Sequence, residues 1–352
     1  MRSCFTWVFL PVFFIISLPL KGQEKKEYSV LTVAFYNLEN LYDIYDDPLI
    51  FDDDRTPGGK DHWTEEIYNE KVKNMAYAIS RIGYEQTKNP PAIVGVCEIE
   101  NLKVLEDLVS QPSLSSHNYG IIHFDSPDLR GVDVAMLYRK SIFRPENSVT
   151  RELLIFDPKA PEKRIYSRDK LVVSGLMEGE KVHIIVNHWP SRSGGEKVSS
   201  FKREKAALLN KHIIDSLQRS DPYARIISMG DFNDDPTNKS IKKMLGAKAN
   251  KEEVGFKELF NPMEGLSKKG IGSLAYRDGW NLFDQILLSK PFLEKDYSAY
   301  SFYKAGIFNE QFLVTPTGQY KGYPFRSFGD GGFTGGFSDA FSVCCLLSKS
   351  KL

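Results

Sequence analysis

The stretch Met229-Gly230-Asp231-Phe232-Asn233-Asp234-Asp235-Pro236 is the most informative part of this chain. It follows the apolar run 225–229, which predicts a buried strand that ends at a glycine. Asp231 and Asn233 are two residues apart, so on a strand or its extended exit both side chains face the same way. The carboxylate and the amide could hold and polarise a water beside a phosphate. Taken alone, however, such residues before a proline are more typical of a turn.

Six further polar residues occupy similar places at the ends of apolar runs. They are Asn37 and Glu39 after 29–36, Glu98 after 92–97, His188 after 182–187, Asp284 within 280–288, and Asp339 before 341–347. Charged groups are seldom buried unless they are paired or bound to a metal. One such residue would be an ordinary polar strand end. Their recurrence along the chain predicts a single convergent site.

The order of these segments resembles the endonuclease/exonuclease/phosphatase family, the DNase I-like metal-dependent phosphoesterases. The matching pieces are Phe-Tyr-Asn-Leu-Glu-Asn at 35–40, Val-Cys-Glu at 96–98, Arg-Gly-Val-Asp-Val-Ala at 130–135, Asn-His-Trp-Pro-Ser-Arg at 187–192, Gly-Asp-Phe-Asn-Asp at 230–234, Phe-Asp-Gln-Ile at 283–286 and Gly-Gly-Phe-Ser-Asp at 335–339. They keep the family order over nearly all of the chain. The resemblance implies a four-layer α/β/β/α sandwich of two mixed sheets with outer helices.

The resemblance also implies a divalent cation and its ligands. Mg²⁺ prefers oxygen, keeps several waters and is typically held by one or two carboxylates. We expect Glu98 to be the first ligand, with Glu39 and Asp339 as the next candidates. Asn37 is expected to orient these ligands or the phosphate of the substrate. Mn²⁺ and Ca²⁺ are alternatives to Mg²⁺.

Catalytic and substrate-binding roles follow from the same resemblance. Asp231 would activate or align the attacking water, and Asn233 would bind a phosphate oxygen. His188 would donate a hydrogen bond to the phosphate or move a proton. Arg130 and Arg192 are candidate phosphate contacts because a guanidinium group can bind two oxygens at once. For either arginine, a surface salt bridge is an equally good interpretation.

One motif departs from the family pattern. The family ends its site with Ser-Asp-His, and this chain has Ser338-Asp339-Ala340. Asp284, which in the family orients that histidine, therefore lacks its expected partner. Three interpretations follow: another group substitutes and gives a weaker enzyme, the protein binds phosphorylated ligands without turnover, or the change is inactivating. A structural envelope protein with relic motifs is a further hypothesis.

Bulk properties narrow the function further. Lys plus Arg and Asp plus Glu both number 46 in 352 residues, so no net positive field favours tight, sequence-blind duplex binding. Residues 1–22, with Arg2 before the apolar run 5–20, predict a signal peptide and hence a periplasmic or secreted protein. An uncleaved anchor is the alternative. Residues 23–352 are expected to form one domain with no stable membrane span.

The substrate remains open between nucleic acid, a phospholipid headgroup and a small phosphodiester, and no protein partner is expected.

Periodicity supplies the expected elements. Strands are predicted at 29–36, 92–97, 119–124, 132–138, 170–176, 182–187, 225–229, 282–288 and 341–347, and helices at 65–82, 102–109, 196–217 and 239–245. Cys97, Cys344 and Cys345 are expected to be small buried hydrophobic residues rather than zinc ligands or disulfide partners.

Overall fold

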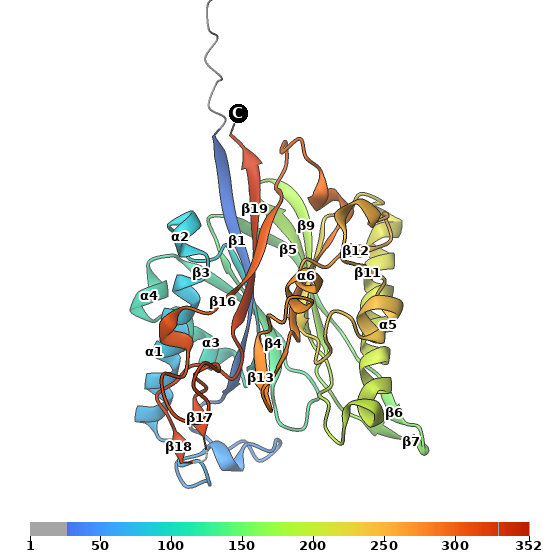
Figure 1. Ribbon diagram of the computed structural model, residues 1–352. Coiled ribbons are helices and arrows are strands. Elements are labelled where there is room, and N and C mark those ends of the chain that lie inside the picture. The colour runs from blue at the N-terminus through green and yellow to red at the C-terminus, as the bar shows by residue number, and fades with distance from the viewer. Residues whose placement is uncertain (1–26, 330, 352) are drawn as a thin grey trace, which may run out of the picture.

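The computed structural model describes residues 27–329 and 331–351. The expected signal peptide, residues 1–22, lies outside these residues. Two β-sheets pack face to face, and helices cover the outer face of each sheet (Figure 1). The four-layer α/β/β/α architecture predicted from the sequence is therefore confirmed.

The first sheet is mixed and has six strands. In spatial order they are β16 (Ser301–Phe308), β19 (Ser342–Ser350), β1 (Tyr28–Leu41), β2 (Ile93–Ile99), β4 (Asp133–Arg139) and β3 (Tyr119–His123). Its outer face is covered by α1 (Glu65–Arg81), α2 (Tyr84–Thr87), α3 (Leu102–Val109) and α4 (Pro112–Ser115). The α1 helix begins where the Thr64 side chain accepts a hydrogen bond from the backbone N–H of Ile67, with Glu65 and Glu66 in the first turn.

The second sheet is also mixed and has seven strands. In spatial order they are β11 (Ala247–Lys248), β12 (Leu259–Phe260), β15 (Asp284–Ser289), β10 (Ile226–Asp231), β9 (Glu180–His188), β8 (Lys170–Met177) and β5 (Phe143–Arg151). The long helix α5 (Glu196–Ser220) and the short π-helix η2 (Ser240–Met244) cover its outer face.

Short elements complete the described chain. They are the β-hairpins β6 (Ile155–Asp157)–β7 (Ala160–Ile165), β13 (Leu274–Tyr276)–β14 (Gly279–Asn281) and β17 (Phe328–Gly329)–β18 (Gly332–Phe333), the helix α6 (Met263–Ser267), and the 3-10 helices η1 (Asp53–Arg55), η3 (Lys251–Glu253), η4 (Lys290–Leu293) and η5 (Gln311–Leu313).

Three apolar layers hold the sandwich together, and strand β1 shows how the sequence builds two of them. Val33 and Phe35 point into the layer between the sheets, whereas Ala34 and Tyr36 point toward α1 and α3. Alternate residues of a strand face opposite sides, so a strand covered on both faces is apolar throughout. The third layer lies between the second sheet and α5.

The main strands and helices predicted from the sequence are present. β5 and β16 were not predicted, because both are partly exposed edge strands without a continuous apolar run. The helix expected at 239–245 is the π-helix η2. The three cysteines are free, as expected; Cys97 and Cys345 are buried, and Cys344 is half-buried. Among the described residues, no helix has the length and apolar character needed to cross a membrane.

Gly230 marks a close approach of two backbones beside the predicted site. It pairs with Asn187 where the parallel strands β9 and β10 end. A Cβ atom at this position would lie 2.2 Å from the backbone oxygen of Asn187 and 2.6 Å from its Cβ. A side chain would therefore push apart the two strands that carry His188 and Asp231.

We expect Gly230→Ala to lower the free energy of unfolding by about 1–3 kcal/mol, because the added carbon overpacks against backbone that cannot move away. Gly306→Ala, on the edge strand β16 with no atom within 4 Å of the new Cβ, is the matched control and should change stability by less than about 0.5 kcal/mol. Urea unfolding measures both. Equal effects of the two substitutions would contradict the close-approach argument.

Candidate active site

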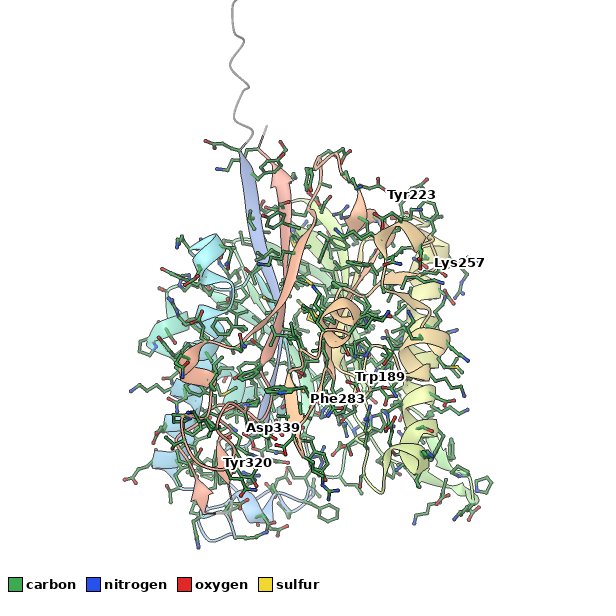
Figure 2. The ribbon with its side chains drawn as sticks, viewed as in Figure 1. Trp189, Tyr223, Lys257, Phe283, Tyr320 and Asp339 are labelled. Carbon is green, nitrogen blue, oxygen red and sulfur yellow. The ribbon has the colours of Figure 1, made fainter. Side chains whose placement is uncertain are left out.

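The strand directions bring the predicted residues to one edge of the sandwich. β1 and β2 are parallel, as are β9 and β10, so the carboxyl ends of each pair lie together. β15 and β19 run antiparallel to β10 and β1, so their starts reach the same edge. The residues placed there are Asn37 and Glu98 from the first sheet, His188 and Asp231 from the second, Asp284 at the start of β15, and Asp339 three residues before β19. In Figure 2, Asp339 lies near the lower end of the two sheets.

Asp231 makes a polar contact between the two sheets at the candidate site. Its Oδ2 atom lies 3.4 Å from Nδ2 of Asn37, which donates to it from the other sheet. Its Oδ1 atom accepts a 2.8 Å hydrogen bond from the backbone N–H of Asn233. Burial raises the pKa of Asp231 to about 6, the bond from Asn233 opposes the rise, and the negative charge of Glu98 adds to it. Asp231 can therefore act as a base near neutral pH.

His188 stands between the carboxylates of the two sheets. Its Nε2 atom lies 3.7 Å from Oε1 of Glu98 and 3.9 Å from Oδ2 of Asp231, both too long for direct hydrogen bonds. Burial lowers the pKa of His188 well below its usual range, and the positive charges of Arg168 and Arg130 add to this effect. The ring is therefore neutral at pH 7 and can donate one hydrogen bond to a phosphate oxygen.

Strained backbone accompanies the polar strand ends. Glu39, Asn40, Glu98 and Asn233 have φ values of 46°, 54°, 59° and 49°. These values lie in the left-handed region, which is uncommon for residues other than glycine. The β1–β2 and β2–β4 ladders also shift register here. Such strain concentrates at functional sites because the surrounding structure must hold it in place.

Glu98 remains available for a ligand. Its Oε2 atom accepts a 3.1 Å hydrogen bond from the backbone N–H of Asn40, and its Oε1 atom faces His188. Its side chain is about one-sixth exposed, at 15%. The position of Glu98 therefore fits the role of first metal ligand predicted from the sequence.

Glu39 is fully engaged by the loop that precedes Asp339. Its Oε1 atom accepts a hydrogen bond from Nε of Arg326 at 3.0 Å and forms an ion pair with Nη2 of the same residue at 2.9 Å. Its Oε2 atom accepts from the backbone N–H and the hydroxyl of Ser327, both at 2.7 Å. Buried Lys71 donates to the backbone oxygen of Glu39 and to Ser327 Oγ. The structure therefore places Glu39 as an anchor of this loop, and a metal would have to displace these donors.

Asp339 approaches the same cluster of carboxylates from the start of β19. Ser338 fixes the preceding turn: its hydroxyl donates to the backbone oxygen of Asn37 at 2.8 Å and accepts from the backbone N–H of Ala340 at 3.2 Å. Burial raises the pKa of Asp339 well above its usual range, and the negative charges of Glu39 and Glu98 raise it further. A cation beside Asp339 would relieve this repulsion.

The three predicted metal ligands do not form a compact cage. Within residues 27–329 and 331–351, the one group of three His, Cys, Asp or Glu side chains with ligand atoms all within 4.8 Å is His123, Asp125 and Asp133. Mg²⁺ usually keeps several waters and needs only one or two carboxylates. Glu98 with Asp339 is therefore a donor set that suits a hydrated Mg²⁺, while Glu39 supports the adjacent loop.

One carboxylate oxygen of Asp284 lacks the partner that a histidine at position 340 was expected to provide. Its Oδ2 atom accepts a 2.6 Å hydrogen bond from the hydroxyl of Ser273, whereas its buried Oδ1 atom has no partner among the described residues. Leu274, next to Ser273, forms a β-bridge with Ala340. Burial raises the pKa of Asp284 well above its usual range, and the negative charge of Asp231 adds to the rise.

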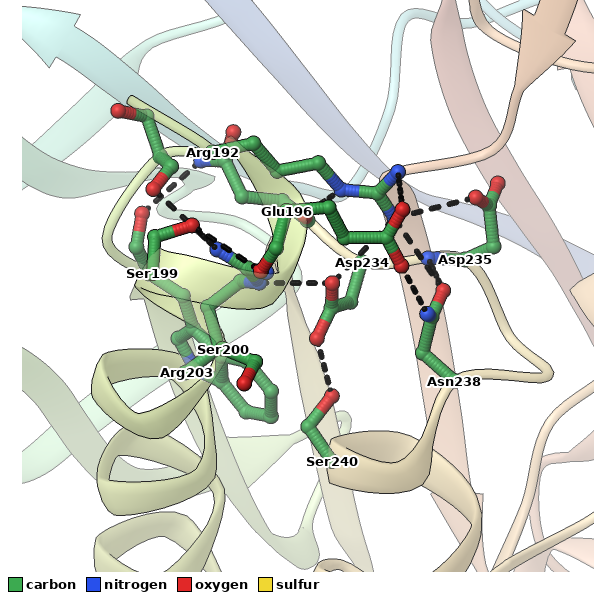
Figure 3. Close-up of polar contacts among 12 residues, drawn as sticks. Arg192, Glu196, Ser199, Ser200, Arg203, Asp234, Asp235, Asn238 and Ser240 are labelled. Atoms are coloured by element: carbon green, nitrogen blue, oxygen red, sulfur yellow. Dashed lines mark hydrogen bonds and ion pairs between the residues drawn. The ribbon is translucent and has the colours of Figure 1, made fainter. Parts of the chain in front are cut away.

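The two predicted phosphate-binding arginines lie in different surroundings. Arg130 is exposed, and its Nε atom lies 3.4 Å from Asp128. Arg192 binds the loop after β10 instead: its Nε atom donates to the backbone oxygen of Asn233 at 2.9 Å, and its Nη2 atom contacts Asp234, Asp235 and Asn238 (Figure 3). With these bonds made, Arg192 positions the loop of Asn233 rather than projecting a free guanidinium.

Buried ionic contacts stiffen the support around Asn233. Nε of buried Arg203 lies 2.7 Å from Oδ1 of Asp234, and the Ser240 hydroxyl donates to Oδ2 of Asp234 at 2.6 Å (Figure 3). The Asn233 side chain donates to the backbone oxygen of Trp189 at 2.9 Å. The predicted contact of Asn233 with a phosphate oxygen would therefore use the second N–H of its Nδ2 atom, because the amide oxygen can only accept a hydrogen bond.

Several residues near the site were not predicted from the sequence. Arg168 is buried and donates to Asp128 at 2.9 Å and to the backbone oxygen of Trp189 at 2.6 Å. Arg326 had no sequence signal, because its partner Glu39 is 287 residues away. Lys71 did have one: it is three residues after Tyr68 and four before Met75, so it shares the buried face of α1.

Comparison with known proteins identifies the family to which this chain belongs. A sequence profile of the Endonuclease/Exonuclease/phosphatase family matches residues 32–349, and the chain belongs to that family. A search of curated protein sequences finds no match.

Solved structures share the fold at low identity. A humanized D. rerio TDP2 is 15% identical with a TM-score of 0.52, covering 91% of this chain and 99% of its own. A mannosyl-6-phosphatase from Bacteroides thetaiotaomicron is 18% identical with a TM-score of 0.52, covering 90% and 99%. An endonuclease/exonuclease/phosphatase family protein from the same organism is 18% identical with a TM-score of 0.52, covering 92% and 97%. These likenesses support the fold.

We expect Glu39→Gln to loosen the loop without abolishing metal binding. The amide keeps an acceptor for Ser327 but loses the charge-assisted bonds to Arg326, so stability in EDTA should fall by about 1–3 kcal/mol. Thermal unfolding, and amide exchange at Ser327, measure the change. Glu98→Gln is the control, with little loss in EDTA. A loss of Mg²⁺ affinity in Glu39→Gln with unchanged stability in EDTA would instead make Glu39 a metal ligand.

Proposed function

We propose that the protein is a divalent-cation-dependent phosphoesterase that hydrolyses phosphate esters. The single observation that carries the proposal is the position of His188 at the junction of the two sheets, where its Nε2 atom lies within 4 Å of one carboxylate oxygen of Glu98 and one of Asp231. Membership of the Endonuclease/Exonuclease/phosphatase family supports the same reaction class. Mg²⁺ is the cation that suits these hard oxygen donors, with Mn²⁺ or Ca²⁺ as alternatives.

Each residue has a task in this reaction. A cation held by Glu98 and Asp339 would neutralise charge on the phosphoryl oxygens. Asp231 accepts the proton of the attacking water, whose oxygen forms a bond to phosphorus while the bond to the leaving oxygen breaks. The neutral ring of His188 donates a hydrogen bond to a phosphoryl oxygen. Asn37 holds Asp231 in place across the sheets.

Position 340 is expected to limit the rate. Ala340 offers no side-chain donor, and the Oδ1 atom of Asp284 has no partner in the described part of the chain. Removing one donor to a developing charge typically slows an enzyme by about 10²–10³-fold. The protein would therefore be a slow phosphoesterase. Another donor, such as His188, would compensate in part for the side-chain donor that is missing at position 340.

A second candidate function is phosphate-ligand binding without turnover, which the same alanine favours. It predicts that Mg²⁺ with a phosphate ester raises the melting temperature while no product forms. An inert relic site would respond to neither. Thermal shift and product analysis on the same samples separate these outcomes.

Export is part of the proposal. It rests on the charged start and apolar run of residues 1–22, which is typical of a signal peptide. The substrate would then be a phosphate ester in the periplasm or the medium, and nucleic acid is one candidate.

We expect the mature protein to hydrolyse bis-p-nitrophenyl phosphate or DNA with Mg²⁺ and not with EDTA. Ala340→His should be faster by roughly 10²-fold, because the imidazole gains Asp284 as its partner. Asp231→Asn is the inactive control, and circular dichroism checks that each variant folds. If neither the wild type nor Ala340→His shows metal-dependent activity, the phosphoesterase proposal fails.

We also expect activity to need ionised Asp231. Because the pKa of Asp231 is raised to about 6, the base is mostly ionised at pH 7 and becomes protonated as the pH falls through 6. A bound cation would lower the pKa of Asp231 and so shift the acid side of the activity profile to lower pH. The kcat/KM profile should therefore decline on the acid side at or below about pH 6, with a slope of one proton. A profile that rises as the pH falls through this range would exclude Asp231 as the base.

A further inference from the structure

A row of aromatic side chains extends from the candidate site to the surface. Phe341, two residues after Asp339, is buried and stacks on Trp280 with ring centres 6.0 Å apart and an angle of 13°. Trp280 lies 6.0 Å from Tyr323, and Tyr323 lies 5.8 Å from Tyr320. We call Phe341, Trp280, Tyr323 and Tyr320 the aromatic row. Trp280 is 40% exposed and Tyr320 is 52% exposed, so the row begins in the core and ends in solvent.

The aromatic row is tied to the catalytic edge through the β13–β14 hairpin, which carries Trp280. At its base, the Ser273 backbone oxygen accepts a 2.9 Å bond from the N–H of Phe341, and the Ser273 hydroxyl binds Asp284. Leu274 bridges to Ala340. A change in the position of Trp280 would therefore alter the positions of Asp284 and Ala340.

The loop that carries Tyr320 and Tyr323 is fixed to the tip of the same hairpin. The hydroxyl of Tyr323 donates to Oδ1 of Asp278 at 2.6 Å and accepts from the backbone N–H of Asp278 at 2.9 Å. These polar atoms thus satisfy each other. The indole of Trp280 and the ring of Tyr320 stay exposed on a well-anchored support, which folding alone does not require.

Cationic side chains flank the aromatic row. Arg277 lies over the ring of Tyr276, 5.2 Å from its centre, and Tyr276 is 62% exposed. Lys321 lies between Tyr320 and Tyr323 in sequence and is exposed, as is Arg326 at the Glu39 anchor. Exposed aromatic rings interleaved with cations bind nucleotides well, because bases stack on the rings while the cations contact phosphates.

We propose that the phosphate esters hydrolysed by this protein carry a nucleobase, which stacks on the aromatic row at Trp280 and Tyr320 when the adjoining phosphate lies at Asp231 and His188. This inference rests on the proposed function. A sugar ring also stacks on aromatic side chains, but it needs many free polar groups around it. Here the polar groups of Asp278 and Tyr323 are hydrogen-bonded to each other, so the aromatic row suits a nucleobase better than a sugar.

Calorimetric titration of the mature protein in Mg²⁺ tests the inference with thymidine monophosphate, mannose 6-phosphate and inorganic phosphate. Trp280→Ala should weaken thymidine monophosphate binding by roughly 5- to 150-fold, the range of base stacking on one aromatic side chain, and Trp280→Phe should restore most of it. Tyr320→Ala should act in the same direction. Inorganic phosphate should bind the wild type and all variants equally, which also shows that the site is still folded.

Tyr223→Ala is the matched control, because Tyr223 is an exposed tyrosine at the upper end of the molecule in Figure 2, whereas Tyr320 and Asp339 are at the lower end. Unchanged thymidine monophosphate binding in Trp280→Ala would overturn the inference, as would an equal dependence of mannose 6-phosphate on Trp280. Row-dependent nucleotide binding without hydrolysis of any ester would refute the proposed function alone. Metal-dependent hydrolysis with nucleotide binding that ignores the row would refute this inference alone.

Discussion

Repulsion between buried carboxyl groups is the constraint on which the site depends. Glu98 belongs to the first sheet and Asp339 lies in the loop just before strand β19 of that sheet. Asp231 and Asp284 belong to the second sheet, and the sandwich brings all four to one edge. The pKa values of Asp231, Asp284 and Asp339 are all raised, by burial first and by neighbouring negative charge as well. Burying several acidic groups together is unfavourable unless protons or a cation compensate. An arrangement that costs stability in this way fits a site built to bind a cation.

The rest of the structure holds this arrangement in place. The Arg192 and Arg203 contacts with Asp234 fix the loop after β10, and the Glu39 contacts with Arg326 and Ser327 fix the loop before β19. Removing one partner of such a buried ionic pair costs more than the pair contributes, since it leaves a buried charge unpaired. These networks therefore keep the strand exits in a defined geometry despite the left-handed backbone at Glu39, Glu98 and Asn233.

The sequence predicted the architecture, because buried strands have continuous apolar runs, and it predicted that the polar residues of the family motifs would follow these strands to one edge of the sandwich. It missed β5 and β16, since edge strands lack such runs. It also proposed Glu39 as a metal ligand without showing that Arg326, 287 residues later, occupies its carboxylate. A motif specifies the residue type, whereas contacts between distant loops decide which of its lone pairs remain free.

Calorimetric titration of Mg²⁺ into the mature protein, repeated in buffers of different ionisation enthalpy, tests the central claim most directly. A cation bound beside Asp339 favours the ionised carboxylate, so it would lower the raised pKa of this group and release a proton wherever the group is protonated. We predict that Mg²⁺ binding releases protons, which a binding enthalpy that changes with the buffer would show. We also predict that Glu98→Gln strongly weakens Mg²⁺ binding. Absence of Mg²⁺ binding, or binding that is indifferent to both Glu98 and the buffer, would contradict the account.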